Sequence, residues 1–487
     1  MVKKKFYVTT AIDYVNAKPH IGHAFEKVLA DALCRWKKLK GEKVFLLTGT
    51  DENAQKNAQV AKEQGIPVKK FVDRNSKYFI EMCKVLNVDY DRFIRTTEKE
   101  HKKISQDIFE KVYDGGEIYK GKYEGLYCVG CEAFVTEKDL VNGYCPEHKK
   151  KPEFVSEDAY FFKLSKYKNK LIKFVENYIV PEDKKNEILS RLKNEELRDL
   201  CVSRSNLDWG IDSPIDKNFK IYVWFDALIN YYSGASGNWP ADVHIVGKGI
   251  NWFHSVIWPA MLMSAEIELP KKLLVHSYLT VDGQKISKSL GNVIDPVELA
   301  KKYPADSIRY ALLKGTPFSD FDFSEKYLIE KHNNELANKL GNLVSRVAGL
   351  IEKYGVEKNQ KWDAPFSLIE VEKDTEKFMK NYEFDKALNR IFAFVDICNR
   401  YVQNEKPWEI HEEDFKKAVL YNLKESILKI AFLLKPFIPE SAEKIEKTFN
   451  AKKIKKAEIL FKKIGLEDGL KNGIKNSGLK DGLKKGL

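Results

Sequence analysis

Two short apolar stretches near the start of the chain flank a segment of helical periodicity. Residues 6–10 and 44–48 are rich in β-branched and aromatic side chains, as strands are. Between them, apolar residues recur every three or four positions over residues 21–39, and Gly41 follows as a helix stop. A strand, a helix and a second strand in succession predict a βαβ unit, which opens a parallel, doubly wound sheet. Because ligands of such sheets lie beyond the carboxyl ends of the strands, we expect the chemistry in the loops that follow the two strands.

The pattern breaks up over residues 115–215, where glycines, a cysteine cluster and short mixed segments alternate. We interpret this region as an insertion into a nucleotide-binding domain that begins with residues 1–114 and resumes with residues 216–265. Residues 221–225 and 243–246 are strand-like and are predicted to return to the same sheet.

Helical spacing dominates residues 325–460, in which glycine is scarce and Leu336, Leu340 and Leu343 are examples of the apolar repeat. This pattern predicts a helical bundle domain. Glycine then recurs about every fourth position of residues 461–487, each time followed by Leu or Ile. The spacing imitates a helix face, but each interior glycine costs about 1 kcal/mol relative to alanine, so we predict a frayed, basic, glycine-rich tail.

Composition narrows the class of protein. The 487 residues include 83 Lys+Arg and 71 Asp+Glu, a net charge of +12, and 43% are hydrophobic. The length allows about three domains, and the aromatic content excludes disorder along the whole chain. The positive charge fits a polyanionic partner such as nucleic acid, and equally an ordinary lysine-rich surface.

The distribution of apolar residues predicts neither a signal peptide nor a membrane span. No apolar segment of signal-peptide length follows the basic start, and no run approaches the ~20 residues of a membrane span. Seven cysteines, three of them clustered with a histidine, indicate a reducing compartment with a metal site rather than a disulfide framework. We therefore expect a cytoplasmic protein without a membrane contact.

Two histidines stand where the first helix is expected to begin, in Lys-Pro-His-Ile-Gly-His at residues 18–23. Proline suits a first helical turn, and the free N–H groups of that turn attract anions. Gly22 allows a flat base to approach the backbone, and His20 and His23 can donate hydrogen bonds to phosphate oxygens. The alternative is a plain helix start with two surface histidines.

A second polar segment, Asp-Gly-Gln-Lys-Ile-Ser-Lys-Ser-Leu-Gly-Asn at residues 282–292, carries Lys285 and Lys288. A flexible lysine loop can close on a triphosphate and stabilise charge that develops on departing pyrophosphate. Taken alone, two lysines three apart are more often a solvated turn.

The strongest purely chemical pattern is Cys128-x2-Cys131, thirteen residues, and Cys145-x2-His148. Three thiolates and one imidazole at this spacing fill a tetrahedral Zn²⁺ shell and leave no open position for catalysis. Chance free thiols are the alternative.

The histidine and lysine segments together resemble the HIGH and KMSKS signatures of class I aminoacyl-tRNA synthetases, with Ile286 in place of Met. Residues 24–284 separate them, too few for the large editing insertion of the leucine, isoleucine and valine enzymes. Over nearly its full length the chain is similar to the methionyl-tRNA synthetases. That similarity is carried by residues 9–12, the cysteine knuckles, residues 222–227, residues 253–262 and the helical C-terminal domain.

The resemblance implies an α/β fold: a Rossmann-like parallel-sheet catalytic domain with a zinc-bearing insertion, a KMSKS-type loop and stem-contact region over residues 266–324, and a helical anticodon-binding domain. The resemblance also implies a reaction in two steps. Methionine attacks Mg·ATP to give methionyl-adenylate, and tRNA(Met) then takes the acyl group. Catalysis would be positioning and charge stabilisation by His20, His23, Lys285 and Lys288, with no general base. The appended oligomerisation module of the family is not recognised after the bundle, so a monomer is expected.

The resemblance to this family also implies which residues bind ATP, methionine and the anticodon. ATP would be bound by His20, Gly22, His23, Gly247, Lys285 and Lys288. The ammonium group of methionine would be bound by Asp51, and the rest of methionine by Ile12, Tyr14, Trp224, Ala227, Leu228, Tyr231, Ile250, His254 and Trp258. An aromatic lining suits a polarizable thioether. Asn342, Arg346 and Trp408 would read the anticodon, with local packing as the alternative.

Five positions depart from the family pattern: Asn53 and Ala54 stand where His-Gly is usual, Gly249 where an aspartate is common, Ser277 where glycine is common, and Asp13 where Tyr or Pro is usual. These changes bear on nucleotide and methionine affinity.

Two rival functions remain open from the sequence. One is a cysteine-activating class I enzyme that uses scattered zinc ligands such as Cys34, Cys201 and His254. The other is an inactive paralogue that binds tRNA without charging it. Pyrophosphate exchange with a panel of amino acids separates all three.

Overall fold

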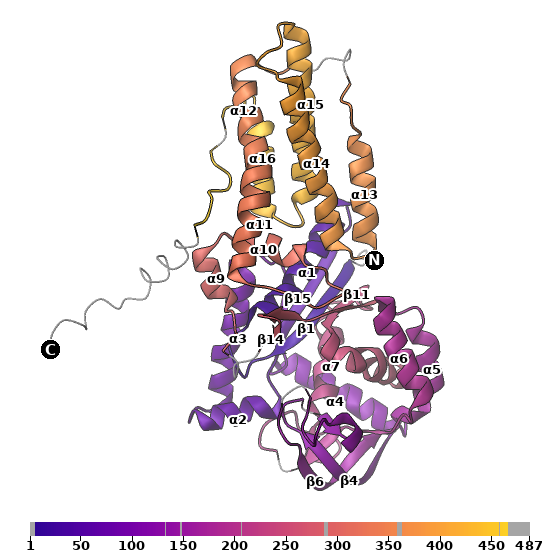
Figure 1. The fold of residues 1–487 in the computed structure, drawn as a ribbon. Coiled ribbons are helices and arrows are strands. Elements are labelled where there is room, and N and C mark those ends of the chain that lie inside the picture. The colour runs from indigo at the N-terminus through magenta and orange to yellow at the C-terminus, as the bar shows by residue number, and fades with distance from the viewer. Residues whose placement is uncertain are drawn as a thin grey trace, which may run out of the picture. The chain divides into compact units, whose positions relative to one another are not determined.

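The computed structural model describes residues 5–131, 133–146, 149–205, 207–286, 291–357, 363–456 and 458–465 (Figure 1). The chain forms two compact units. The first unit consists of Met1–Pro19, Lys40–Lys84 and Asp89–Ser277, and the second of His20–Leu39, Val85–Val88 and Tyr278–Leu487.

A six-stranded, wholly parallel sheet forms the centre of the first unit, in the order β3-β2-β1-β11-β12-β7. The chain runs from β1 outward to one side through β2, and returns to the other side of β1 with β11, so the strand order reverses beside β1. Such a reversal is the point at which doubly wound sheets bind ligands, and it confirms the predicted fold class. The strands are β1 (Phe6–Tyr14), β2 (Val44–Asp51), β3 (Arg92–Arg95), β7 (Ile179–Val180), β11 (Val243–Gly247) and β12 (Leu273–His276).

Both opening strands are longer than the sequence pattern predicts. They continue past the apolar stretches to Tyr14 and Asp51, which are paired across β1 and β2. Every residue of β2 is buried, as expected for a strand covered on both faces.

The strand predicted at residues 221–225 is wrong. Only Phe219–Ile221 is extended, as β10, and it pairs antiparallel with β9 (Ser203–Ser205) in a separate small sheet. A helix, α7 (Val223–Ser233), begins directly afterwards. Its residues from Val223 to Tyr231 are all buried, so the apolar run carries no helical period and its length alone does not distinguish strand from helix.

The first unit contains further helices and helical turns. They are α2 (Gln55–Glu63), α3 (Val68–Val85), whose last residue belongs to the second unit, α4 (Lys99–Asp114), the 3₁₀ turn η3 (Lys248–Ile250), the π-helical turn η4 (Phe253–Ile257) and α8 (Trp258–Ser264). Helix α4 packs against α7, where the rings of Phe109 and Phe225 meet edge-on at 5.2 Å.

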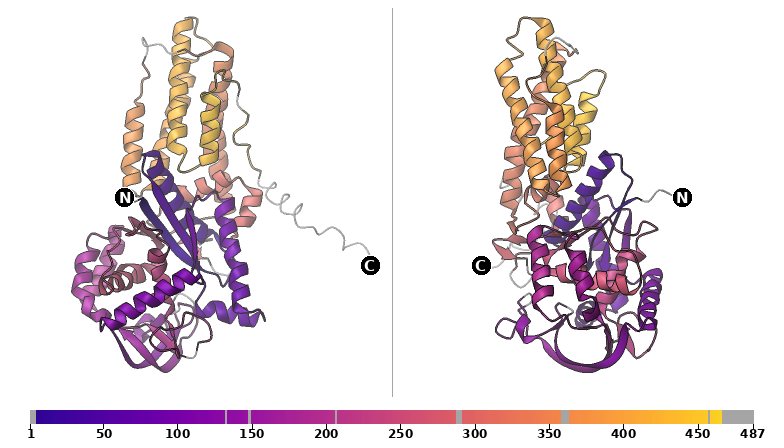
Figure 2. Two further views of the ribbon diagram at one scale, coloured as in Figure 1. Left: turned by 180° about the vertical axis from the view of Figure 1, so that it is seen from behind. Right: turned by 90° about the vertical axis from the view of Figure 1, so that its right-hand side faces the viewer.

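The predicted insertion has its own antiparallel sheet, in the order β5-β4-β6-β8. Its two long strands pair from Ile118↔Phe162 to Tyr127↔Glu153 and curve together (Figures 1 and 2). One short strand of this region, β7, joins the main sheet instead, beside β12. The elements are β4 (Ile118–Cys128), β5 (Ala133–Val135), η1 (Glu137–Asp139), β6 (Glu153–Phe162), η2 (Leu164–Tyr167), α5 (Lys168–Val175), α6 (Glu182–Asn194) and β8 (Leu200–Cys201).

The second unit begins with α1 (Ile21–Leu39), the predicted first helix, which packs against α10 and β13. Three short strands and two helices accompany it. They are β13 (Leu279–Val281), β14 (Gln284–Lys285), α9 (Pro296–Lys302), α10 (Ala305–Lys314) and β15 (Phe321–Asp322).

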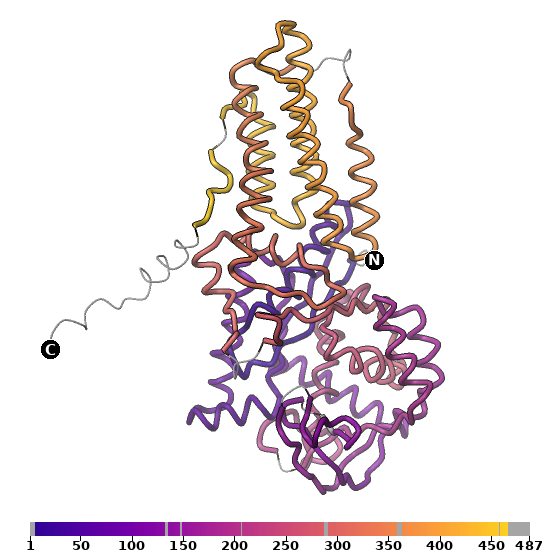
Figure 3. Tube along the Cα trace, in the orientation of Figure 1, coloured from indigo at the N-terminus to yellow at the C-terminus, as the bar shows by residue number. Residues whose placement is uncertain are grey.

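A helical bundle forms the rest of the second unit, as predicted, and its long helices run side by side (Figures 1 and 3). Leu336, Leu340 and Leu343 are all buried in it. The elements are α11 (Glu325–Lys331), the π-helical segment η6 (His332–Gly341), α12 (Asn342–Tyr354), α13 (Leu368–Lys380), α14 (Phe384–Glu405), α15 (Glu413–Leu434) and α16 (Pro439–Phe449).

After α16 the chain returns along the bundle as an extended segment. The side chain of Asn333 accepts a hydrogen bond from the backbone N–H of Ile464 at 2.9 Å and donates one to its carbonyl at 2.8 Å. The predicted frayed tail falls almost wholly on residues 466–487, outside the described residues. Over the part of the chain that is described, no helix combines the length and apolarity needed to cross a membrane.

Candidate functional site

The histidine pair at the start of α1 is locked by its own backbone. The ring of His20 stacks on that of His23 with 3.8 Å between centroids. The Nδ1 atom of His23 accepts the backbone N–H of His20 at 3.0 Å, and Nδ1 of His20 accepts that of Gly22 at 3.1 Å. With both Nδ1 atoms acting as acceptors, each neutral ring carries its proton on Nε2 and can donate from there.

Burial keeps both rings neutral. It lowers the pKa of His23 to about 3, and the nearby Lys27 adds to this effect. Burial likewise places the pKa of His20 well below its ordinary value, with further contributions from His23, Lys27 and Lys285. The pair therefore presents two Nε2–H donors without charge at neutral pH.

Gly22 leaves little room for a side chain beside the histidine pair. A Cβ atom at this position would lie 3.0 Å from two ring atoms of His20 and 3.7 Å from Cδ1 of Ile286. The start of α1 and the lysine segment are thus neighbours within the second unit, as the sequence reasoning expects.

The lysine segment begins as a tight hairpin of β13 and β14. Its turn residues Asp282 and Gly283 both have positive φ, 54° and 68°, as a type I′ turn requires. Asp322 secures the turn by accepting the backbone N–H of Gly283 at 2.8 Å and the hydroxyl of Thr280 at 2.9 Å. Lys285 follows on β14 with its Nζ 4.6 Å from the ring centre of Tyr278, while Lys288 lies outside the described residues.

An aromatic cluster in the first unit contains the residues expected to bind methionine. Trp224 stacks on Phe253 at 3.8 Å, and Tyr14 meets its edge at 6.3 Å. Leu228, Trp258 and the partly buried Ile12 and Ile250 pack in the same apolar core. Ala227 lies on the same buried helix α7.

A hydrogen-bonded pair lies within this cluster. The hydroxyl of Tyr231 and Nε2 of His254 are 2.7 Å apart, and Nδ1 of His254 is 2.9 Å from the carbonyl oxygen of Ile250. A carbonyl only accepts, so Nδ1 carries the proton, and Nε2 of the neutral ring accepts from the Tyr231 hydroxyl. His254 belongs to the π-helical turn η4, a distortion that is frequent at functional sites.

Asp51 lies at the carboxyl end of β2, directly across from Tyr14 on β1, and its side chain is buried, with 2% exposed. The ammonium candidate is therefore placed beside Tyr14 of the aromatic cluster, one strand away from the reversal of strand order.

His244 is a buried polar residue that the sequence reasoning missed. Nε1 of Trp258 donates to its Nε2 at 3.3 Å, and its Nδ1 lies 2.6 Å from the hydroxyl of Thr9. Burial lowers its pKa well below the ordinary value, so it is neutral and donates from Nδ1. A histidine inside an apolar strand segment was the signal available.

The cysteine knuckle holds part of the aromatic cluster. Nε1 of Trp224 donates to the carbonyl of Cys131 at 3.3 Å. Nζ of Lys56 donates to the carbonyl of Gly130 at 3.1 Å and lies 3.2 Å from the ring centre of Tyr14.

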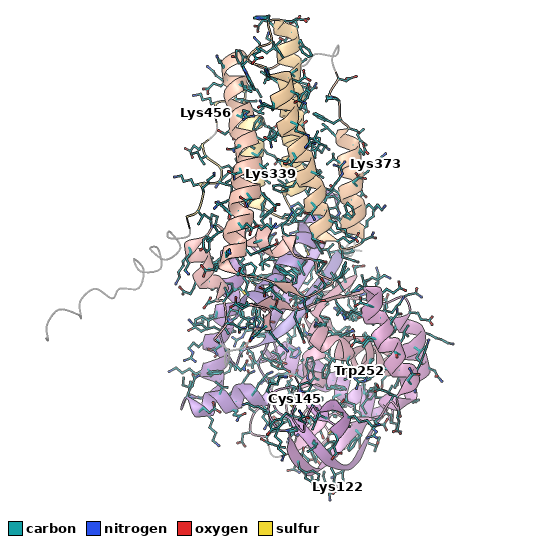
Figure 4. All side chains as sticks on the ribbon, viewed as in Figure 1. Lys122, Cys145, Trp252, Lys339, Lys373 and Lys456 are labelled. Carbon is teal, nitrogen blue, oxygen red and sulfur yellow. The ribbon has the colours of Figure 1, made fainter. Side chains whose placement is uncertain are left out.

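Three thiols converge in that knuckle. The Sγ atoms of Cys128, Cys131 and Cys145 all lie within 4.8 Å of one another, and those of Cys131 and Cys145 are 3.5 Å apart (Cys145 is labelled in Figure 4). Zinc–sulfur bonds of ~2.3 Å at tetrahedral angles place thiolates about 3.8 Å apart, so the cluster fits a single metal ion. The fourth expected ligand, His148, lies outside the described residues.

Gly247 and Gly249 lie in the first unit, at the end of β11 and in η3. Gly249 lines a cavity of about 410 Å³ together with Lys248, Asn251 and Trp252, the last of which is labelled in Figure 4. No carboxylate stands at Gly249 itself, as noted from the sequence.

The three anticodon candidates are exposed. Asn342 and Arg346 are one helical turn apart on α12, and the amide of Asn342 donates to the carbonyl of Asn338 at 2.8 Å. Trp408 follows α14 with 42% of its surface exposed, and its Nε1 is 3.2 Å from a carboxylate oxygen of Glu409. Its exposure argues against the alternative that Trp408 closes the bundle core.

Comparison with known proteins gives consistent results. A family model described as class I tRNA synthetases (M) matches residues 6–151 and 138–348, and one described as the anticodon-binding domain of tRNA ligase matches residues 367–468. The chain is 43% identical to a methionine–tRNA ligase of Clostridium acetobutylicum over 96% of this chain and 79% of that one. It is 40% identical to a methionine–tRNA ligase of Thermotoga maritima, over 91% and 74%. Among solved structures it is similar to Mycobacterium tuberculosis methionyl-tRNA synthetase in complex with methionyl-adenylate, with a TM-score of 0.88, 36% identity, and 91% and 94% of the two chains covered.

Proposed function

Because this chain belongs to the methionyl-tRNA synthetases of class I, we propose a role for each of its candidate site residues. Its reaction is the ATP-dependent activation of methionine to methionyl-adenylate and the transfer of the methionyl group to tRNA. Its partners are ATP, methionine and tRNA.

His20, Gly22, His23 and Lys285 bind ATP in this proposal, with Lys288 and Gly247. The support is geometric: two neutral Nε2–H donors lie at the start of a helix, beside a hairpin that carries Lys285. Neutral donors and the helix terminus suit phosphate oxygens, and a lysine suits charge that develops on departing pyrophosphate. Mg²⁺ enters with the triphosphate.

Methionine binds at the aromatic cluster, with its ammonium group on Asp51. The Tyr231–His254 hydrogen bond is the observation that carries this assignment. It uses the polar hydrogen of the Tyr231 hydroxyl internally, so the cluster offers mainly ring faces and edges. A thioether interacts well with such surfaces, whereas a side chain that needs strong hydrogen bonds does not.

Zinc is the metal proposed for the cysteine knuckle, with His148 as the fourth ligand. Thiolates favour Zn²⁺, and four protein ligands leave no position for substrate. The ion is structural in this proposal: it fixes the carbonyls of Gly130 and Cys131, which bind Lys56 and Trp224.

Asn342, Arg346 and Trp408 read the anticodon, because exposed donors and an exposed ring plane are what unstacked loop bases require.

The domain boundaries proposed from the sequence stay as they are: catalytic halves 1–114 and 216–265, insertion 115–215, stem-contact region 266–324, anticodon domain 325–460 and tail 461–487. We further propose a cytoplasmic monomer, since charged tRNA is consumed by translation there.

Amino-acid-dependent pyrophosphate exchange tests the proposal, followed by charging of tRNA(Met). We expect exchange with methionine and none above background with cysteine. Exchange with cysteine alone would favour the cysteine-activating rival, and tRNA binding without any exchange would favour the inactive paralogue.

A further inference from the structure

A buried polar network joins α7 to α4 and to the loop after β2, through residues other than those assigned above. Asp226 in the first turn of α7, His101 on α4 and Asn53 in the loop after β2 have 1%, 1% and 5% of their surfaces exposed. All three belong to the first unit.

Asp226 has both carboxylate oxygens satisfied. Its Oδ1 lies 2.6 Å from Nε2 of His101, and its Oδ2 accepts from Nδ2 of Asn53 at 2.8 Å. Nδ1 of His101 is in turn 2.7 Å from the hydroxyl of Ser233, near the end of α7. Burying a carboxylate is costly unless it is hydrogen-bonded, and this one is held from two sides.

Asn53 joins this network to the ammonium anchor. Its Nδ2 also donates to the carbonyl of Thr96 at 3.1 Å, and since both neighbours only accept, the amide nitrogen must face them. Its backbone N–H donates to Oδ1 of Asp51 at 3.3 Å. One residue therefore contacts the carboxylate proposed for the ammonium group and the helix that carries Trp224 and Ala227.

Packing alone already holds α4 against α7, through the Phe109–Phe225 contact. A buried polar network adds little stability beyond what apolar side chains of similar size give, but it fixes one geometry. The network is thus better suited to setting a distance than to holding the fold.

We propose that the Asn53–Asp226 hydrogen bond, with His101 orienting Asp226, sets the spacing between Asp51 and the α7 wall, and so tunes the binding of methionine by both its ends. The proposal rests on the assignment of Asp51 and α7 to methionine. Asn53 and Asp226 are positioning residues: they act through Asp51 and Trp224 and do not touch the substrate. Asn53, a departure from the family pattern, acquires a role in this way.

The test is steady-state pyrophosphate exchange by the full chain carrying Asn53→Leu, which keeps the size of Asn53 and removes its donors. We expect the KM for methionine to rise about tenfold or more, while kcat and the KM for ATP stay within about twofold. Asn53→His, which retains a ring N–H donor for Asp226, should keep the KM for methionine within about threefold of wild type. Inhibition by 4-(methylthio)butyrate, which lacks the amino group, should weaken less than methionine binding in Asn53→Leu.

Asn238→Leu is the matched control. Asn238 is also buried and donates to two carbonyls, those of Ala235 and Ser236, in the turn after α7. The Asn238→Leu variant should lose about as much stability as Asn53→Leu and leave the KM for methionine unchanged.

The possible results separate the two proposals. Methionine-dependent exchange by the wild type establishes the proposed function, and its absence refutes that function. If the wild type is active, an unchanged KM in Asn53→Leu overturns the network inference. Equal KM effects in Asn53→Leu and Asn238→Leu, or failure of Asn53→His to preserve the KM, also overturn it.

Discussion

The Nη2 atom of Arg309 lies 2.6 Å from Oδ2 of Asp31, and neither side chain is exposed to solvent. This ion pair joins α10 to α1, the helix that follows His20 and carries His23. The remaining guanidinium hydrogens are donated to the carbonyls of Leu86, Asn87, Pro436 and Phe437, at 2.9 to 3.2 Å.

Arg309→Ala is therefore expected to destabilise the protein by about 3–5 kcal/mol, because it leaves the buried Asp31 carboxylate with Arg35 as its remaining cation and removes the Arg309 donors from the four carbonyls. Denaturant unfolding measures the change. Arg390→Ala removes a partly exposed ion pair with Asp374 and should cost about 1 kcal/mol or less. Equal effects of the two variants would contradict the role of the buried pair.

His23 should make stability depend on pH. Its folded pKa is about 3, below the unfolded value of ~6.5, so its contribution is complete above pH 6.5 and is lost as the pH falls from there toward 3. At pH 5 the loss should reach about 2 kcal/mol relative to neutral pH. Comparing the free energy of unfolding at pH 7 and pH 5 for wild type and His23→Gln checks this. A slope that is unchanged in the variant would refute it.

The first βαβ unit and the bundle could be predicted because their apolar residues have a clear period. Helix α7 could not, since burial on all sides removes the period that distinguishes helix from strand. The metal cluster was predictable from spacing alone, whereas the hydrogen bonds that use Asn53, His101 and His244 join segments far apart in the sequence. Single polar residues of this kind give no periodic signal.

Lysine charge should control the rate of activation. Lys285→Ala and Lys288→Ala are each expected to slow methionine-dependent exchange by about 100-fold, mainly in kcat, through loss of charge stabilisation in the transition state. Lys301→Ala, on the exposed side of α9 where it pairs with Glu298, is the control and should change nothing. Full activity of both loop variants would exclude the proposed role.

Replacing Trp408 should affect the charging of tRNA and leave the activation of methionine unchanged. Because a base stack contributes about 1–3 kcal/mol, Trp408→Ala should lower charging efficiency by roughly 5-fold to 150-fold and leave exchange unchanged. The exposed indole predicts a nearly unchanged melting temperature. Trp408→Phe, which keeps a ring plane, should retain most of the charging rate. Normal charging by Trp408→Ala would rule out stacking.

Removal of the metal should lower the stability of the insertion and also weaken the binding of methionine. Purified protein is expected to contain about one equivalent of zinc, and stripping the metal should lower the stability of the insertion and raise the KM for methionine, since Trp224 and Lys56 bind knuckle carbonyls. Cys131→Ser should behave in the same way, and Cys398→Ala, in the bundle, should not. An unaltered KM after complete stripping would show that the knuckle does not position the pocket.

The membership of α1 in the second unit also bears on how the chain is made on the ribosome. Helix α1 is synthesised first, but its partner α10 emerges about 270 residues later, which at ~5–20 residues per second takes roughly 15 to 55 s. During that interval α1, whose buried residues include Leu29 and Leu33, lacks the helix that packs against it in the finished unit. Until more than half of the chain has been synthesised, α1 is therefore without α10, and apolar surface that is exposed during synthesis favours aggregation.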